Sequence, residues 1–109
     1  MIGGKVLSKK ILRGAILESA LLSLIQNATD NGIYGYSILK TVKKKFGVRL
    51  GPSTLYPELR HLEKQGLIDS RWEISFRKAR RQYRITPKGK NQLQRYFAEI
   101  KTVIPAFLA

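Results

Sequence analysis

The chain has 109 residues, which is enough for one domain with a modest hydrophobic core. Its 21 Lys and Arg residues outnumber 7 Asp and Glu residues and give a formal net charge of +14. So many positive charges repel one another and attract a polyanion. Nucleic acid is the leading candidate for this partner, ahead of an anionic membrane surface or an acidic protein. The sequence has no cysteine, which excludes disulfides, thiolate metal sites and a cysteine nucleophile.

The N-terminal part predicts a basic tail followed by a helix. Residues 1–9 contain two glycines and two lysines, and we expect a solvated tail, with a basic arm along a phosphate backbone as the alternative. From Ile11 to about Asn27 apolar residues recur at helical spacing. Their surface is wider than one neighbouring helix needs, so part of it could meet a second subunit. Arg13 and Glu18 interrupt the stretch, which is too short and too charged for a membrane span, and we expect a cytoplasmic protein.

A second helix is predicted from Tyr34 to about Phe46. At its start, Tyr36 and Ser37 are candidates for contacts that position a DNA backbone, because a phosphate can approach helix N–H groups there. Four lysines crowd the C-terminal half, where cations complement the helix dipole, although they could also touch phosphates. These are Lys40, Lys43, Lys44 and Lys45.

The stretch Gly51–Gly66 predicts a third helix, with Pro52 suited to the first turn and Gly66 as the stop. One face is apolar and carries Leu55, Leu59 and Leu62. The opposite side carries hydroxyls, an aromatic ring and bases, which suits a DNA major groove, although an ordinary surface helix can show the same pattern. The candidates for groove contacts are Ser53, Thr54, Tyr56 and Arg60. Arg60 is the best candidate for bidentate guanine recognition, whereas Tyr56 could equally pack beside Leu59.

After Gly66 the apolar period changes from helical to alternating, which predicts a two-stranded hairpin. From Ser75 to Lys90 there are seven Lys and Arg residues and no acid. A charge run usually marks a solvated face. At a hairpin tip beside a candidate reading helix, it favours contact with phosphates or the minor groove. The predicted contacts in this hairpin, or wing, are Arg77, Lys78, Arg80 and Arg81.

Thr86 and Pro87 predict the start of a last helix that runs to about Val103 and is ended or kinked by Pro105. Its apolar residues form a nearly coiled-coil stripe, which favours a dimer interface, packing onto the first helix, or both. The predicted dimer contacts are Leu93, Tyr96, Phe97, Ile100, Val103 and Ile104. We therefore expect a DNA-binding domain over residues 1–86 and a dimerisation helix over residues 87–109.

The single tryptophan and the single histidine are not expected to form a catalytic or metal site. Trp72 is expected in the core, with a ligand platform at a dimer interface as the alternative. His61 is the only histidine and lies beside no Asp or Cys, so we expect plain exposure or a hydrogen bond to phosphate rather than metal binding. We find no nucleophile–base–acid set and no phosphate-binding glycine loop, and therefore expect no enzyme, cofactor or metal site.

The order of three helices, a hairpin and a last helix predicts a winged helix-turn-helix fold, α+β and mainly α. Three phrases make the match more specific: YGYSIL at Tyr34–Leu39, STLYPELRHLEKQGLI at Ser53–Ile68 and RRQYRITPKGK at Arg80–Lys90. Together they resemble the PadR family of transcriptional regulators over nearly the whole chain. The chain departs from the usual family phrase at Ser53, where a glycine is typical.

The resemblance implies a homodimeric regulator, typically a repressor, with two reading helices on a pseudo-palindromic operator and wings on the flanking DNA backbone. It also implies that a small aromatic or amphipathic effector can act near the dimer interface, as in some members. A single terminal helix is typical of the short subgroup. Two alternatives stay open: a non-specific architectural DNA-binding protein, and a module that holds protein or RNA. A preference of about a thousandfold for its own promoter over bulk DNA would indicate a regulator.

Overall fold

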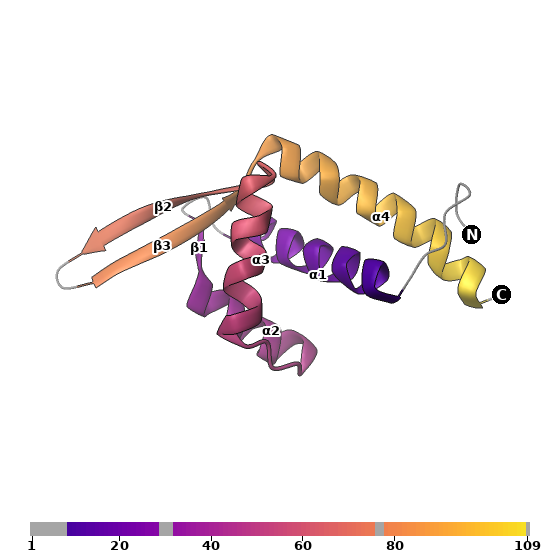
Figure 1. Ribbon diagram of the computed structural model, residues 1–109, viewed down its shortest axis with the longest axis horizontal. Coiled ribbons are helices and arrows are strands. Elements are labelled where there is room, and N and C mark those ends of the chain that lie inside the picture. The colour runs from indigo at the N-terminus through magenta and orange to yellow at the C-terminus, as the bar shows by residue number, and fades with distance from the viewer. Residues whose placement is uncertain (1–8, 29–31, 76–77, 109) are drawn as a thin grey trace.

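The computed structural model describes residues 9–28, 32–75 and 78–108. Within them the elements are α1 (Lys9–Gln26), β1 (Ile33–Tyr34), α2 (Gly35–Phe46), α3 (Pro52–Lys64), β2 (Ile68–Ser75), β3 (Lys78–Ile85) and α4 (Pro87–Leu108). Helices α1 and α4 run side by side, and the β2–β3 hairpin projects away from them (Figure 1). The predicted winged helix fold is confirmed, but the tail predicted for residues 1–9 lies almost entirely outside the described residues.

A short strand, β1, was not predicted. It pairs with β3, so the sheet has three antiparallel strands in the order β1-β3-β2. Tyr34, predicted as the first residue of a helix, is instead a strand residue opposite Gln82. Its hydroxyl donates to the carboxylate of Glu73 and accepts from the Gln82 amide at 3.2 Å. These contacts come from two distant strands, so two residues of local sequence could not reveal them.

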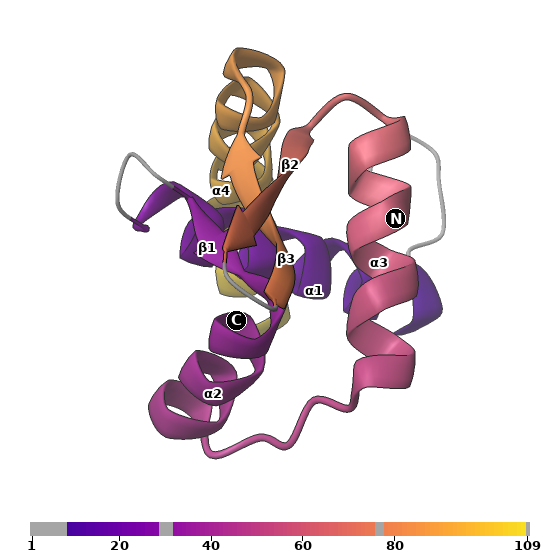
Figure 2. The ribbon, with the colours of Figure 1, turned by 90° about the vertical axis from the view of Figure 1, so that its left-hand side faces the viewer.

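The core lies where α3 meets α1 and α2 (Figure 2). Leu55, Leu59 and Leu62 of α3 are fully buried, as the predicted apolar face requires. They pack in one cluster with Leu21 and Ile38, which are also fully buried. Full burial stabilises each such side chain by about 1.5–3 kcal/mol relative to exposure. The apolar face therefore fixes which side of α3 points outward.

The end of α3 is closed by a glycine turn, as predicted. Gly66 has a φ of 74°, its N–H donates to the Glu63 carbonyl at 2.9 Å, and the Leu67 N–H donates to the Leu62 carbonyl at 3.0 Å. This pair of bonds is a Schellman motif, which glycine favours because it has no Cβ to clash in the left-handed region.

Helix α4 begins directly on that turn. The Thr86 N–H donates to the Leu67 carbonyl at 3.1 Å, and its hydroxyl donates to the Gly66 carbonyl at 2.6 Å. The same hydroxyl accepts from the Gly89 N–H at 3.0 Å and so caps the helix as predicted. A Cβ at Gly89 would lie 2.0 Å from the Leu67 carbonyl oxygen. We call residues 65–67 and 86–89 the α3–α4 junction.

Helix α4 packs along α1 and is longer than predicted. It continues through Pro105 to Leu108 rather than ending near Val103, because a proline in the last turn removes only one backbone bond. Leu93 is 1% exposed and belongs to the chain's own core, so its side chain leaves no surface for a partner. The prediction of Leu93 as a dimer contact is therefore corrected. None of the described helices is long and apolar enough to cross a membrane.

The hairpin rests on the core only at its base. Ile68 and Tyr83 are buried, whereas Trp72 is 60% exposed and Ile74 is 84% exposed. The prediction that Trp72 lies in the core is therefore wrong. The predicted alternation of β2 is correct, but the strands continue beyond the helices, so none of the described helices covers the outer half of the apolar face.

The α3–α4 junction should tolerate no side chain at position 89. We expect G89A to lower the free energy of unfolding by more than about 3 kcal/mol, because the added carbon meets a backbone oxygen that cannot move freely. G14A in α1 is the matched control: nothing lies within 4 Å of its Cβ position, and the change should stabilise by about 0.5–1 kcal/mol. Urea unfolding of both variants tests this, and equal stability of the two would contradict the packing described for Gly89.

Candidate nucleic-acid interface

The first two turns of α3 form an exposed polar surface. Ser53, Thr54 and Arg60 are all exposed, on the side away from the buried leucines. The structure thus brings together three of the four side chains predicted to contact a DNA groove. Their contact with bases stays a prediction.

Tyr56, the fourth candidate, has a structural contact with α2. A Cβ at Gly35 would lie 2.8 Å from Cε1 of the Tyr56 ring and 2.9 Å from its hydroxyl oxygen. The ring therefore packs over the first residue of α2 rather than beside Leu59 alone. Since 37% of Tyr56 stays exposed, the residue can hold α3 against α2 and still present an edge to a ligand.

Of the two predicted contacts at the start of α2, one side chain is exposed and the other is partly covered. Tyr36 is exposed, and the Lys40 ammonium lies 5.2 Å from the centroid of its ring. Ser37 is half-buried, and its carbonyl accepts a hydrogen bond of 2.8 Å from the Thr41 hydroxyl. Both residues lie one helix away from α3, where contacts to a DNA backbone remain a prediction.

The wing cations differ in how firmly they are held. Arg77 lies outside the described residues, and Lys78 is exposed near the hairpin end. The Arg80 guanidinium lies 4.4 Å from the centroid of the Tyr34 ring, an attractive cation–π distance. The Tyr34 ring therefore holds the Arg80 side chain on the face of the sheet that also carries Glu73.

Arg81 is bound within the protein. It donates to the Ser70 hydroxyl at 2.8 Å and to a Glu63 carboxylate oxygen at 3.3 Å. The Ser70 hydroxyl donates to the other Glu63 oxygen, and the guanidinium lies 5.6 Å from the centroid of the Trp72 ring. Arg81 thus ties the wing to the end of α3. The sequence predicted Arg81 as a DNA contact in or beside the hairpin loop and did not reveal Glu63 as its partner.

His61 is exposed but also lies close to an acidic side chain of α1. Its Nε2 lies 3.5 Å from a Glu18 carboxylate oxygen, and the other Glu18 oxygen accepts from the Tyr96 hydroxyl of α4. Burial and this hydrogen bond raise the pKa of Tyr96 to about 12, so the hydroxyl remains a donor at neutral pH. Burial, followed by the charge of Glu18, raises the pKa of Glu58. The expectation that His61 is exposed is confirmed, whereas its acidic partner, which comes from another helix, was not predicted.

Apolar side chains remain exposed on α1 and α4. Phe97 is 44% exposed and Ile104 is 46% exposed, and Ile16 on α1 is also exposed. Tyr96 is half-buried, and its hydroxyl donates a hydrogen bond to Glu18. Among the described residues no group of three or more His, Cys, Asp or Glu side chains could hold a metal ion.

Comparison with known proteins agrees with this geometry. Residues 21–95 match the Transcriptional regulator PadR-like family. The chain is 38% identical over 72 residues to transcriptional regulator Rv3488 of Mycobacterium tuberculosis, a match covering 66% of each protein and so just under two thirds of that relative.

Two solved structures show the same fold. A PadR family transcriptional regulator from Eggerthella lenta has a TM-score of 0.78 and 31% identity, over 88% of this chain and 81% of that one. Bacillus subtilis PadR in complex with operator DNA has a TM-score of 0.67 and 29% identity, over 75% of this chain and 46% of that one. These relatives are regulators and not enzymes. Because residues 21–95 are well over half of the sequence, the chain belongs to the PadR-like family of transcriptional regulators.

Proposed function

We propose that this chain binds DNA sequence-specifically as a homodimer and represses the genes that its operator controls. The observation that carries the proposal is that α3 has one buried apolar face and one exposed polar face. Its leucines are fully buried, while Ser53, Thr54 and Arg60 are exposed together over the first two turns. The operator complex of Bacillus subtilis PadR, which shares the fold, supports DNA as the partner.

In this proposal α3 lies in the major groove. Arg60 donates two hydrogen bonds to a guanine edge, a contact worth about 1–3 kcal/mol of discrimination against another base. Ser53 and Thr54 contact neighbouring base edges or phosphates. Lys78 and Arg80 bind flanking phosphates, which supply affinity but little sequence information. Arg81 acts mainly by holding the wing at a fixed position relative to α3.

A homodimer would present two such helices. The exposed Phe97 and Ile104 of α4, with Ile16 of α1, offer an apolar surface that a second copy could cover. Two-fold symmetry would then require inverted half-sites, spaced by about 34–36 Å or a multiple of it. Repression is the sign of regulation that the family resemblance implies. The proposed repressor would act in the compartment that holds the chromosome.

The net charge of +14 favours one alternative, a non-specific architectural DNA-binding protein. Such a protein needs the cations but not the particular side chains on α3. The two functions therefore differ in what happens when the exposed face of α3 is removed.

We expect T54A/R60A to abolish site selection while leaving bulk binding intact. The ratio of operator to bulk affinity should fall from at least about a thousandfold to about tenfold or less, because the base contacts are lost and the phosphate contacts remain. Electrophoretic mobility shifts with promoter and scrambled duplexes measure both constants. The control is R95A, which removes an exposed arginine from α4. A wild-type protein that binds both duplexes equally would support the architectural alternative.

We expect F97E/I104E to convert the dimer to a monomer, because the two substitutions place buried charge in the proposed interface. Sedimentation equilibrium gives the mass directly. K101E introduces the same residue type at an exposed polar position of the same helix and should leave the dimer intact. If the wild-type chain sediments as a monomer at micromolar concentration, the dimer part of the proposal is wrong.

A further inference from the structure

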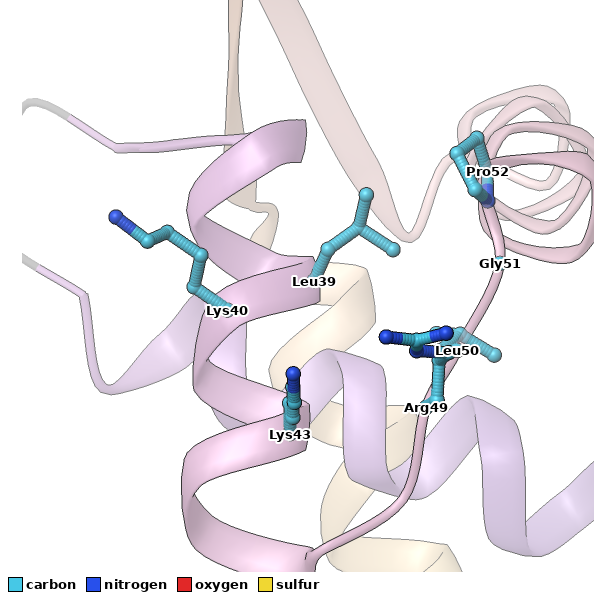
Figure 3. Close-up of a pocket in the computed structure, with 7 residues that line it drawn as sticks. All are labelled: Leu39, Lys40, Lys43, Arg49, Leu50, Gly51 and Pro52. Atoms are coloured by element: carbon cyan, nitrogen blue, oxygen red, sulfur yellow. The ribbon is translucent and has the colours of Figure 1, made fainter.

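A shallow pocket lies between α2 and the segment that connects it to α3 (Figure 3). Its volume is about 270 Å³. Leu39, Leu50 and Pro52 give it an apolar floor, and cationic side chains stand at its rim. Phosphate contact was an open alternative for Lys40 and Lys43, but the sequence alone did not group Lys43 with Arg49.

Two cations converge on this pocket from opposite walls. Lys43 belongs to α2 and Arg49 to the connecting segment, and in Figure 3 both extend into the space between those walls. Lys40 also lines the pocket but turns away, toward the ring of Tyr36. Lys43 and Arg49 are both exposed, so they can reach a ligand without any rearrangement of the core.

Within the part of the chain that the structure describes, neither Lys43 nor Arg49 takes part in an ion pair. From residue 35 to residue 57 the sequence has five Lys and Arg residues and no Asp or Glu. The ion pairs found within the described ranges involve His61, Arg81 and Arg84. The dipole of α2 accounts for Lys43 in its last turn, but Arg49 lies beyond the end of that helix. Two like charges facing one pocket repel, and an anion between them would remove that cost.

The pocket lies at the opposite end of α3 from the wing. Its wall includes Pro52, the first residue of α3, and Ser53 and Thr54 follow at once. The wing begins after the last turn, where Arg81 contacts Glu63. A helix of 13 residues is about 20 Å long, longer than the width of the major groove, which is about 12 Å. A helix lying in that groove therefore approaches phosphates at both ends.

We propose that Lys43 and Arg49 together hold a backbone phosphate of duplex DNA at the N-terminal end of α3. The inference rests on the proposed function, since it requires that the chain binds DNA through α3. Arginine can donate two parallel hydrogen bonds to one phosphate, and lysine adds a mobile point charge. With the wing at one end and this pair at the other, the position of Arg60 along the groove is fixed from both sides.

The experiment compares the salt dependence of binding to a random-sequence duplex for wild type and K43Q/R49Q. Loss of two phosphate contacts should lower the slope of log affinity against log salt by about 1.8 per bound chain. K90Q/R95Q removes one lysine and one arginine from exposed positions of α4 and should leave the slope nearly unchanged. K43R/R49K keeps both charges in place and should retain the wild-type slope.

The outcomes separate this inference from the proposed function. An unchanged slope for K43Q/R49Q, an equal drop for K90Q/R95Q, or no duplex binding by the wild type would each overturn the phosphate site. A wild type that lacks preference for its promoter would refute specific regulation, yet the slopes on the random duplex would still decide whether Lys43 and Arg49 contact phosphate. Melting temperatures of all variants should agree within a few degrees, because every substituted side chain is exposed.

Discussion

The Leu67 carbonyl is the point on which the arrangement of this domain depends. It accepts a hydrogen bond from the Thr86 N–H at 3.1 Å, and α4 passes so close to it that only glycine fits at position 89. Helix α3 ends one turn earlier, and the wing begins one residue later. The end of α3, the start of the wing and the start of α4 are therefore held together by one small set of backbone bonds.

A second set of contacts joins α3 and α4 through a side chain of α1. Glu18 of α1 accepts from Tyr96 of α4 and faces His61 of α3, so three helices share one carboxylate. Arg81 adds a link between the wing and α3 through Glu63. In the proposed dimer, such ties would let α4 set the separation of the two reading helices. A regulator that reads paired half-sites needs this constraint, because half-site spacing is a matter of geometry.

What the sequence predicted correctly is local in origin. The leucine face of α3, the glycine stop at Gly66 and the cap at Thr86 depend on residues within a turn or two of one another. What it missed depends on distant residues. Strand β1 is defined by β3, the partner of His61 is on α1, and Trp72 is exposed because the hairpin outruns the helices. The position of Arg49 across a pocket from Lys43 likewise depends on the fold and not on the local sequence.

The most direct measurement is a genome-wide footprint of the protein in its own cells. If α3 reads sequence and two copies act together, we expect a small number of occupied sites. Each should contain an inverted repeat whose half-site centres lie about 10–10.5 base pairs, or a multiple of that, apart. Even occupancy along the chromosome, without a shared repeat, would contradict specific reading by α3 and leave only the electrostatic attraction of a chain with a net charge of +14.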